Sequence, residues 1–355
     1  MCDPASKASP PLAMSNSASP PKPATWLACP EPSMPALTQE TVMPVTRIPL
    51  GLPRFDADAI AYAAARLTPR DYQVLEHLLH HRVLTTHQLQ RLFFTKPQPT
   101  RRRLGILHKL NTITRYRPWS PYGGSHPHHW VLGRAGAELL ALRSHTTVKE
   151  LGYHPDLAMS IAVSSKSGHQ IGVNDFFVHL GHLARHNPDA SLRAWLSEKQ
   201  CAKIWGDLTR PDAYGCWSEH GRQIDFFLEH DTGSMTLAKV TSKLAAYADL
   251  ADATRIITPV LFWLPSHARE ANLRSLINTA DLPVATAAHT GLGDGPAGPC
   301  WLPTTARSDH RRMRLVDLAN GWPHLPLGRT PEQPVSAEDD RKFLDRVFSE
   351  EGQSR

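Results

Sequence analysis

The order of hydrophobic patterns between residues 170 and 264 constrains the fold most strongly. Two segments carry apolar residues at helical spacing, and three short segments between them have the alternation of β-strands. A nearly continuous apolar run then follows, which is typical of a strand covered on both faces. The helices are expected over Gln170–His186 and Thr236–Leu250, and the strands over Leu192–Leu196, from Arg210, over Ile224–Glu229 and over Ile256–Leu264. This order predicts an α/β core with one mixed sheet.

Acidic residues stand at the ends of two of these strands. Pro211-Asp212 opens one strand, and Glu229-x-Asp231 closes the next. This is the spacing of the PD-(D/E)xK nuclease core, in which hard oxygen ligands hold the Mg²⁺ needed to hydrolyse a phosphodiester. We expect Asp212 and Glu229 to be metal ligands and Glu198 to add a third.

The lysine of that core is where the sequence departs from the pattern. Asp231 occupies the usual lysine position, whereas Lys243 lies on the following helix, from which it could reach the same site and stabilise charge. The candidate catalytic residues are therefore Asp212, Glu229, Asp231 and Lys243. Acids two residues apart on a strand are common. Solvated edge carboxylates, or a fold of this type that has lost its chemistry, therefore stay open as alternatives.

The segment from residue 67 to 142 is expected to form three helices and a hairpin. Thr68-Pro69-Arg70-Asp71 and Thr85-x-x-Gln88 are helix-start signals for the first two helices. A turn at residues 96–99 leads into the third helix, and strands are expected over Thr112–Trp119 and His129–Leu132. This is the layout of a winged helix-turn-helix, whose third helix enters the major groove of DNA while the hairpin follows the backbone.

The positive charge of the chain is concentrated in this segment. The net charge is +6 overall, but residues 54–143 hold 14 Lys and Arg against 5 Asp and Glu, and residues 144–355 carry a net −3. Such a block indicates a polyanionic partner, here double-stranded DNA. The residues expected to bind DNA are Thr100, Arg101, Arg102, Arg103, Lys109, Arg115 and Arg117, with Arg102 and Arg103 as base readers. The alternative is an arginine run that only solvates a helix face.

The remaining composition bounds the organisation and location of the chain. Residues 1–53 carry 12 of the 31 prolines, so we expect a disordered leader there. No run approaches the roughly 20 apolar residues of a membrane span. The start lacks a secretory signal layout, and the five scattered cysteines indicate reduced thiols, so a cytoplasmic location is expected. The expected domains are the leader 1–53, a winged helix 54–143, a nuclease-like domain 150–305 and a polar tail 306–355 with a short helix, Ala337–Glu350.

Several motifs together resemble those of the replication-relaxation family. They are Leu67-Thr-Pro-Arg-Asp-Tyr-Gln-Val-Leu, Arg101-Arg-Arg-Leu104, His129-Trp-Val-Leu-Gly-Arg-Ala-Gly and, most specifically, Pro211-Asp212-Ala…Phe227-Leu-Glu229-His-Asp231-Thr-Gly…Lys243-Leu-Ala-Ala-Tyr247. The resemblance implies a winged-helix half joined to a restriction-endonuclease-like half. It further implies a bacterial plasmid or integrative conjugative element, and a role in replicating or relaxing its DNA. Many members have a basic residue where this chain has Thr232, so one phosphate contact is absent here.

Three functions follow as expectations for this α/β chain, which is α+β overall. The first is a DNA-binding protein of a mobile element. The second is an active Mg²⁺-dependent endonuclease or nickase. The third is a non-catalytic transcriptional or replication regulator, whose second half forms a homodimer or recruits replication or conjugation proteins.

Overall fold

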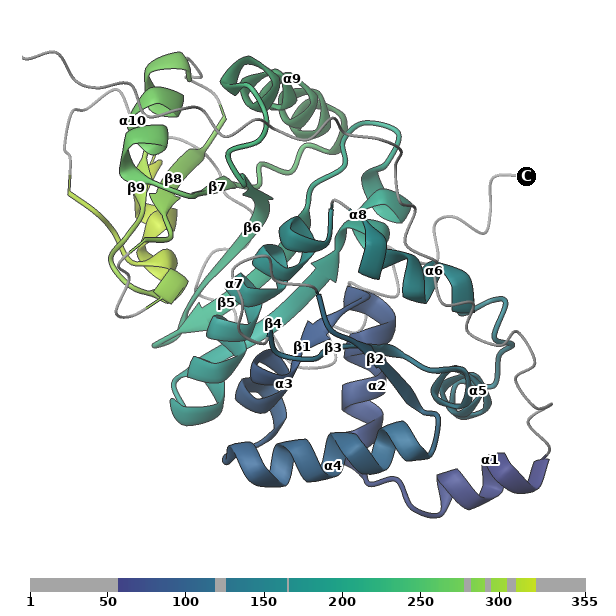
Figure 1. Ribbon diagram of the computed structural model, residues 1–355. Helices are drawn as coiled ribbons and strands as arrows, with labels where there is room; N and C mark the ends of the chain where they lie inside the picture. Colours follow the sequence, from purple (N-terminus) through teal and green to yellow (C-terminus); the bar gives the residue numbers. More distant parts are fainter. Residues whose placement is uncertain are drawn as a thin grey trace, which may run out of the picture. The chain divides into compact units, whose positions relative to one another are not determined.

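Two sheets, one of three strands and one of six, organise the described part of the chain (Figure 1). The computed structural model describes residues 57–118, 126–164, 166–277, 282–290, 295–304 and 311–323. The expected leader and the expected helix in the tail lie outside these residues. Both sheets belong to one compact unit that begins at Arg54.

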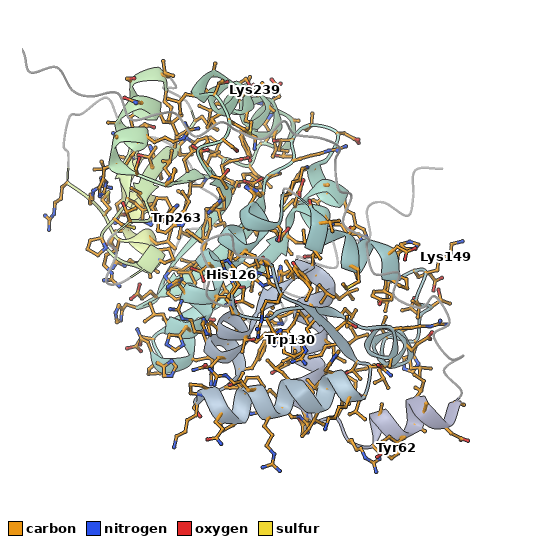
Figure 2. All side chains as sticks on the ribbon, in the orientation of Figure 1. Tyr62, His126, Trp130, Lys149, Lys239 and Trp263 are labelled. Carbon is orange, nitrogen blue, oxygen red and sulfur yellow. The ribbon has the colours of Figure 1, made fainter. Side chains whose placement is uncertain are left out.

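The smaller sheet is antiparallel and has the strand order β1–β3–β2. Its elements are α1 (Ala57–Ala64), α2 (Pro69–His81), β1 (Leu84–Thr85), α3 (Thr86–Phe93), α4 (Pro97–Lys109), β2 (Ile113–Tyr116), β3 (His129–Leu132) and α5 (Arg134–Arg143). Leucines from α2, α3 and α4 pack with Trp130 of β3, which is labelled in Figure 2. The three predicted helices and the strand pair are present, and β2 is shorter than the expected Thr112–Trp119.

The elements from α1 to α5 form the part of the chain called here the helical half. Its helices begin where side chains satisfy the first free backbone N–H groups. At the start of α2, Asp71 Oδ2 accepts hydrogen bonds from the backbone N–H of Thr68 at 2.7 Å and from its hydroxyl at 2.5 Å. At the start of α3, Gln88 Oε1 accepts from the Thr85 backbone at 2.9 Å, and the Thr85 hydroxyl accepts from the Gln88 backbone at 3.2 Å. Both starts lie where the sequence predicts them. Helix α4 begins earlier than expected, at Pro97, because proline is compatible with a first turn.

The larger sheet has the order β4–β5–β6–β7–β8–β9. Strands β4, β5 and β6 are antiparallel neighbours, β6, β7 and β8 are parallel, and β9 is antiparallel to β8. The elements are α6 (Pro155–Ser160), η1 (Ile161–Val163), α7 (Ser167–His186), β4 (Ala190–Ser197), α8 (Glu198–Trp205), β5 (Ala213–Glu219), β6 (Arg222–His230), α9 (Leu237–Thr254), β7 (Val260–Leu264), α10 (His267–Leu276), β8 (Val284–Ala288), η2 (Gly295–Ala297), β9 (Leu302–Pro303) and η3 (Leu315–Gly321). The mixed sheet confirms the predicted order through β7; α8, α10, β8 and β9 were not predicted.

Helices cover both faces of this sheet. Helix α7 packs on one face, where β7 contributes Leu261 and Trp263, the latter labelled in Figure 2. Helices α9 and α10 pack on the other face, where β7 contributes Val260, Phe262 and Leu264. The apolar run in the sequence therefore corresponds to a strand buried on both sides, as expected.

Helix α7 also contacts the helices of the smaller sheet. Asn174 is wholly buried and donates from its amide to the carbonyls of His81 at 3.2 Å and Val83 at 2.6 Å. Gln88 of α3 donates to the carbonyl of Ile171 at 3.1 Å. One helix is thus shared by both halves. Within the described residues, no helix combines the length and the apolar character needed to cross a membrane.

Candidate functional site

The acidic residues singled out in the sequence line one pocket of about 630 Å³, here called the carboxylate pocket. Its walls include Glu198, Asp212, Glu229, Asp231 and Lys243. The start of β5 lies beside the end of β6, because the two strands are antiparallel and Ala213 pairs with Leu228. This pairing brings Asp212, which precedes β5, close to Glu229, the penultimate residue of β6.

Glu229 is held on both carboxylate oxygens by side chains of α9. The residue is 4% exposed; Oε1 accepts from the Tyr247 hydroxyl at 2.5 Å, and Oε2 accepts from the Lys243 ammonium. Positions 243 and 247 share a helix face because they are four residues apart. The lysine therefore reaches Glu229 from the helix.

Asp212 is held by the strand beside it and by α7. Its Oδ2 accepts from the backbone N–H of His230 at 2.8 Å, and its Oδ1 lies 3.2 Å from His169 Nε2. A side chain at Gly172 would meet the His230 ring at 2.3 Å, so this glycine permits the close approach of α7. His169 was not among the predicted residues. Its only signal in the sequence is a polar position beside the start of a predicted helix.

The protonation behaviour of the pocket follows from its crowded charges. Burial and the negative charge of Asp212 raise the pKa of Glu229 to about 7, against the opposing effect of Lys243. Burial raises the pKa of Asp212, but the His169 hydrogen bond and the charges of His169 and Lys243 outweigh it, so the pKa is lowered. Burial lowers the pKa of Lys243, yet the two carboxylates raise it on balance. The negative charge of Asp212 disfavours the ionised form of Glu229, and a cation bound between the two carboxylates would favour that form.

Asp231 lies on the pocket wall, but its oxygens bind elsewhere. Its carboxylate forms an ion pair with Arg269 of α10, in which Nη2 lies 3.1 Å from Oδ1. Oδ1 also accepts from the backbone of Gly233 at 2.8 Å, and Arg269 donates to the carbonyl of Met235 at 2.6 Å. These contacts hold the turn after β6. Arg269 was missed because α10 was not predicted.

Glu198 is the first residue of α8, is exposed, and lines the carboxylate pocket. Across the described ranges, no three His, Cys, Asp or Glu side chains gather closely enough to hold a metal ion by themselves. Mg²⁺ does not require such a group, because it keeps several waters and is bound through one or two carboxylates together with substrate phosphates. The chemistry of Asp212 and Glu229 fits that requirement.

Two of the residues expected to bind DNA have hydrogen-bond partners within the helical half. Thr100 is wholly buried, and its hydroxyl donates to the Lys96 carbonyl at 2.7 Å. Arg103 donates to Asp71 from Nε at 2.9 Å and from Nη2 at 2.5 Å, and also to the Arg66 carbonyl at 2.8 Å. Both side chains lie on the face of α4 that also carries the buried Leu104 and Leu107, so their polar atoms already have partners within the fold, and DNA contact by Thr100 and Arg103 stays a prediction.

The other predicted cations are exposed. Arg101 and Arg102 project from α4, and Figure 2 shows nitrogen-bearing side chains that extend from this helix away from the rest of the chain. Lys109 ends α4, and Arg115 and Arg117 lie on and beside β2.

The two strand arginines converge on one imidazole. Nitrogens of Arg115 and Arg117 lie 3.3 Å and 3.0 Å from His128 Nε2. Burial and then these two arginines lower the pKa of His128. The arginines therefore create a positive field at this end of the small sheet.

Fold and site together define a mixed α/β protein with an acid–lysine pocket and a basic helical half. The chain belongs to the replication-relaxation family, whose sequence model matches residues 75–261, from α2 into β7. The match confirms the resemblance seen in the motifs, and it suggests a role in the replication or relaxation of plasmids or other mobile elements. No protein of curated function and no solved structure matches the chain.

Proposed function

We propose that this chain binds double-stranded DNA and cleaves one of its phosphodiester bonds with Mg²⁺, as a nickase of a plasmid or integrative conjugative element. One observation carries the proposal. Asp212, Glu229 and Lys243 come from three separate elements and line the same pocket. Two hard oxygen ligands beside a cation are the groups that metal-assisted phosphodiester hydrolysis needs.

Each pocket residue has a role in this proposal. Asp212 and Glu229 hold the cation, and Glu198 offers a third oxygen from the rim. Bound Mg²⁺ would supply Lewis-acid activation of the phosphate. Lys243 stabilises negative charge on the phosphate, while Tyr247 and His169 orient the two carboxylates. Asp231 maintains the turn through Arg269 and takes no part in the chemistry.

The architecture supports assigning the two halves to known fold types. The antiparallel β4–β5–β6 unit, followed by α9 and the parallel β7, has the order of a PD-(D/E)xK restriction-endonuclease-like core. Helices α2, α3 and α4 with the β2–β3 pair have the order of a winged helix-turn-helix. In this assignment, α4 is the recognition helix. Its DNA contacts are Arg101, Arg102 and Lys109, with Arg115 and Arg117 on the phosphate backbone.

A nicking assay tests this function. Purified wild type is incubated with supercoiled plasmid and Mg²⁺ or Mn²⁺, beside Asp212→Ala and the exposed control Asp252→Ala on α9. We expect open-circular product from wild type and from Asp252→Ala, and loss of that product with Asp212→Ala. Absence of nicking by wild type, or equal nicking by Asp212→Ala, would sink the nuclease proposal.

A second candidate is a non-catalytic regulator, and the contacts of Glu229 favour it. Both oxygens of that carboxylate are already bound by Lys243 and Tyr247. A buried carboxylate whose two oxygens are both hydrogen-bonded can have a purely structural role. A regulator would bind DNA with unchanged affinity in the presence of Mg²⁺ and leave plasmid supercoiled. Its α/β half would then form a homodimer or recruit replication or conjugation proteins, which size-exclusion chromatography of the full chain would begin to test.

A further inference from the structure

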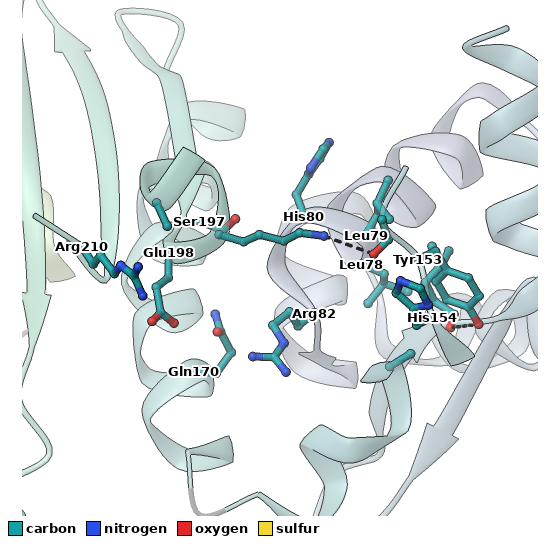
Figure 3. A pocket seen from close by; sticks show the side chains of 15 residues that line it. Leu78, Leu79, His80, Arg82, Tyr153, His154, Gln170, Ser197, Glu198 and Arg210 are labelled. Atoms are coloured by element: carbon teal, nitrogen blue, oxygen red, sulfur yellow. Dashed lines mark hydrogen bonds between the residues drawn. The ribbon is translucent and has the colours of Figure 1, made fainter. Parts of the chain in front are cut away.

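A second pocket, of about 320 Å³, adjoins the carboxylate pocket, and Glu198 lines both. We call it the basic groove, because His80, Arg82, Lys199 and Arg210 contribute to its walls (Figure 3). We propose that the basic groove binds the sugar–phosphate backbone of the DNA strand that occupies the carboxylate pocket. The inference rests on the DNA-cleaving function proposed above.

Arg82 has a backbone conformation that side-chain-bearing residues rarely adopt. Its φ is 67° and its ψ is −50°, directly after the end of α2. The residues on either side of Arg82 are hydrogen-bonded to each other: the backbone N–H of Val83 donates to the carbonyl of His81 at 2.7 Å. This is a γ-turn of the rare, strained kind. Such strain persists only where the surroundings impose it, and it tends to occur at functional positions.

A buried amide imposes this turn. Asn174 donates to the carbonyls of His81 and Val83, the two residues that flank Arg82, and its own oxygen accepts from Gln170 at 3.0 Å. Gln170 also lines the basic groove. Figure 3 shows the Arg82 guanidinium directed into the gap between the end of α2 and Gln170. Helix α7 therefore fixes an arginine at the groove at the expense of backbone strain.

In the described part of the chain, the arginines and the lysine of the groove have no carboxylate within ion-pair distance. The Lys199 ammonium bonds to the carbonyl of Gly152 at 3.2 Å, and Arg210 Nε to that of Gly206 at 3.4 Å. Within the described ranges no carboxylate forms an ion pair with Arg82, and Glu198 is the single acid on the groove walls. Uncompensated cations of this kind are what a phosphate backbone neutralises on binding.

The groove lies beside the carboxylate pocket. Arg210 lies two residues before Asp212, and Gln170 follows His169, so the same two segments line both pockets. Consecutive phosphates could therefore contact the groove cations and the carboxylate site along one strand. Burial lowers the pKa of His80, and the charges of Lys199 and Lys203 lower it further, which reflects the positive field there.

The test uses the full chain with Arg82→Gln and Lys199→Gln combined. The matched control is Arg255→Gln, because Arg255 is an exposed arginine at the end of α9 with a φ of 58°. Binding of a fluorescein-labelled single-stranded oligonucleotide is measured by anisotropy over a salt series without divalent metal. We expect about tenfold weaker binding by the double variant and a salt slope smaller by about 0.7 per lost contact, with the control like wild type.

Two further measurements separate this proposal from others. Arg82→Lys should retain near wild-type affinity, because it keeps the charge and the turn; equal weakening by Arg82→Lys and Arg82→Gln would overturn the phosphate contact. Unchanged affinity and salt slope in the double variant would overturn the groove, whether or not wild type nicks plasmid. Weaker binding by the double variant alongside absent wild-type nicking would uphold the groove and reject the nuclease function.

Discussion

At the scale of single residues, Tyr247 shows how much of the carboxylate pocket depends on groups behind the acids. Its hydroxyl donates to Oε1 of Glu229 and so fixes the orientation of that carboxylate. Removing such an outer hydrogen bond typically costs 10–100-fold in metal affinity. We expect Tyr247→Phe to weaken Mg²⁺ binding about tenfold, measured by calorimetric titration. Tyr153→Phe, which removes a hydroxyl bonded to a backbone carbonyl in the helical half, is the matched control. Equal affinity in Tyr247→Phe and wild type would contradict this role.

Asp231 and Arg269 form the second pair whose role a single substitution reveals. Both side chains are largely buried, with exposures of 6% and 20%. Removing one partner of such a pair leaves a buried charge uncompensated. Arg269→Gln should therefore lower the free energy of unfolding by about 3 kcal/mol, measured by urea denaturation, while Arg255→Gln leaves it unchanged. If Asp231→Asn instead weakened Mg²⁺ binding to the extent expected for Asp212→Asn, Asp231 would be a metal ligand.

At the scale of elements, local signals determined what could be predicted. The starts of α2 and α3 were predictable because their hydrogen bonds join residues three apart. Helix α10 buries only Glu270 and Leu273, so it has no apolar stripe, and β8 is Val-Ala-Thr-Ala-Ala, with few strand-forming residues.

Some residues of the candidate site could likewise be predicted from the sequence, and others could not. The acids Asp212 and Glu229 were identifiable from their spacing in sequence. His169 and Arg269 were not, because their partners lie more than thirty residues away and only the tertiary fold brings them together.

Helix α4 has a structural face and an exposed face, and variants should separate them. Burial raises the pKa of Asp71, but hydrogen bonds from Arg103 and Thr68 outweigh burial and lower it. The resulting stabilisation is present above the unfolded pKa of about 3.9 and is lost as pH falls through the lower folded value. Arg103→Gln should cost about 2 kcal/mol at neutral pH, and in urea denaturation the difference from wild type should shrink as the pH falls below the unfolded pKa of Asp71.

The matched variant Arg102→Gln tests the exposed face of the same helix. It should leave stability unchanged and weaken DNA binding, because Arg102 is exposed and Arg103 is bound to Asp71. The opposite pattern, with Arg103→Gln harmless to stability, would show that the ion pair contributes little.

At the scale of the whole molecule, the charge asymmetry predicts that the proposed DNA binding depends strongly on salt. Five of the cations predicted to bind DNA are exposed in the helical half: Arg101, Arg102, Lys109, Arg115 and Arg117. If each neutralises one phosphate of a duplex, log K should fall against log salt with a slope of about −4.5. Anisotropy titrations of a labelled duplex at several salt concentrations measure this slope. A slope near zero would show that these cations do not bind the backbone.

The two sheets should unfold together, because α7 is part of both halves. Asn174 bonds to two backbone carbonyls at the end of α2, and His81 stacks on Trp195 of β4 with ring centroids 3.6 Å apart. Asn174→Ala would leave both carbonyls buried without this donor. We expect a loss of about 3 kcal/mol, whereas the exposed Asn272→Ala has no effect.

Hydrogen exchange then distinguishes joint from independent unfolding of the halves. Amides of β3 and β6 should lose protection in parallel in Asn174→Ala, because the variant weakens a contact on which both sheets depend. Loss confined to β3 would mean that the helical half opens by itself, and α7 would then not couple the halves. Parallel loss would show that the two halves open as one unit, so that DNA bound by α4 as proposed would keep a fixed position relative to the carboxylate pocket. That fixed geometry would let the helical half determine which phosphodiester the pocket receives.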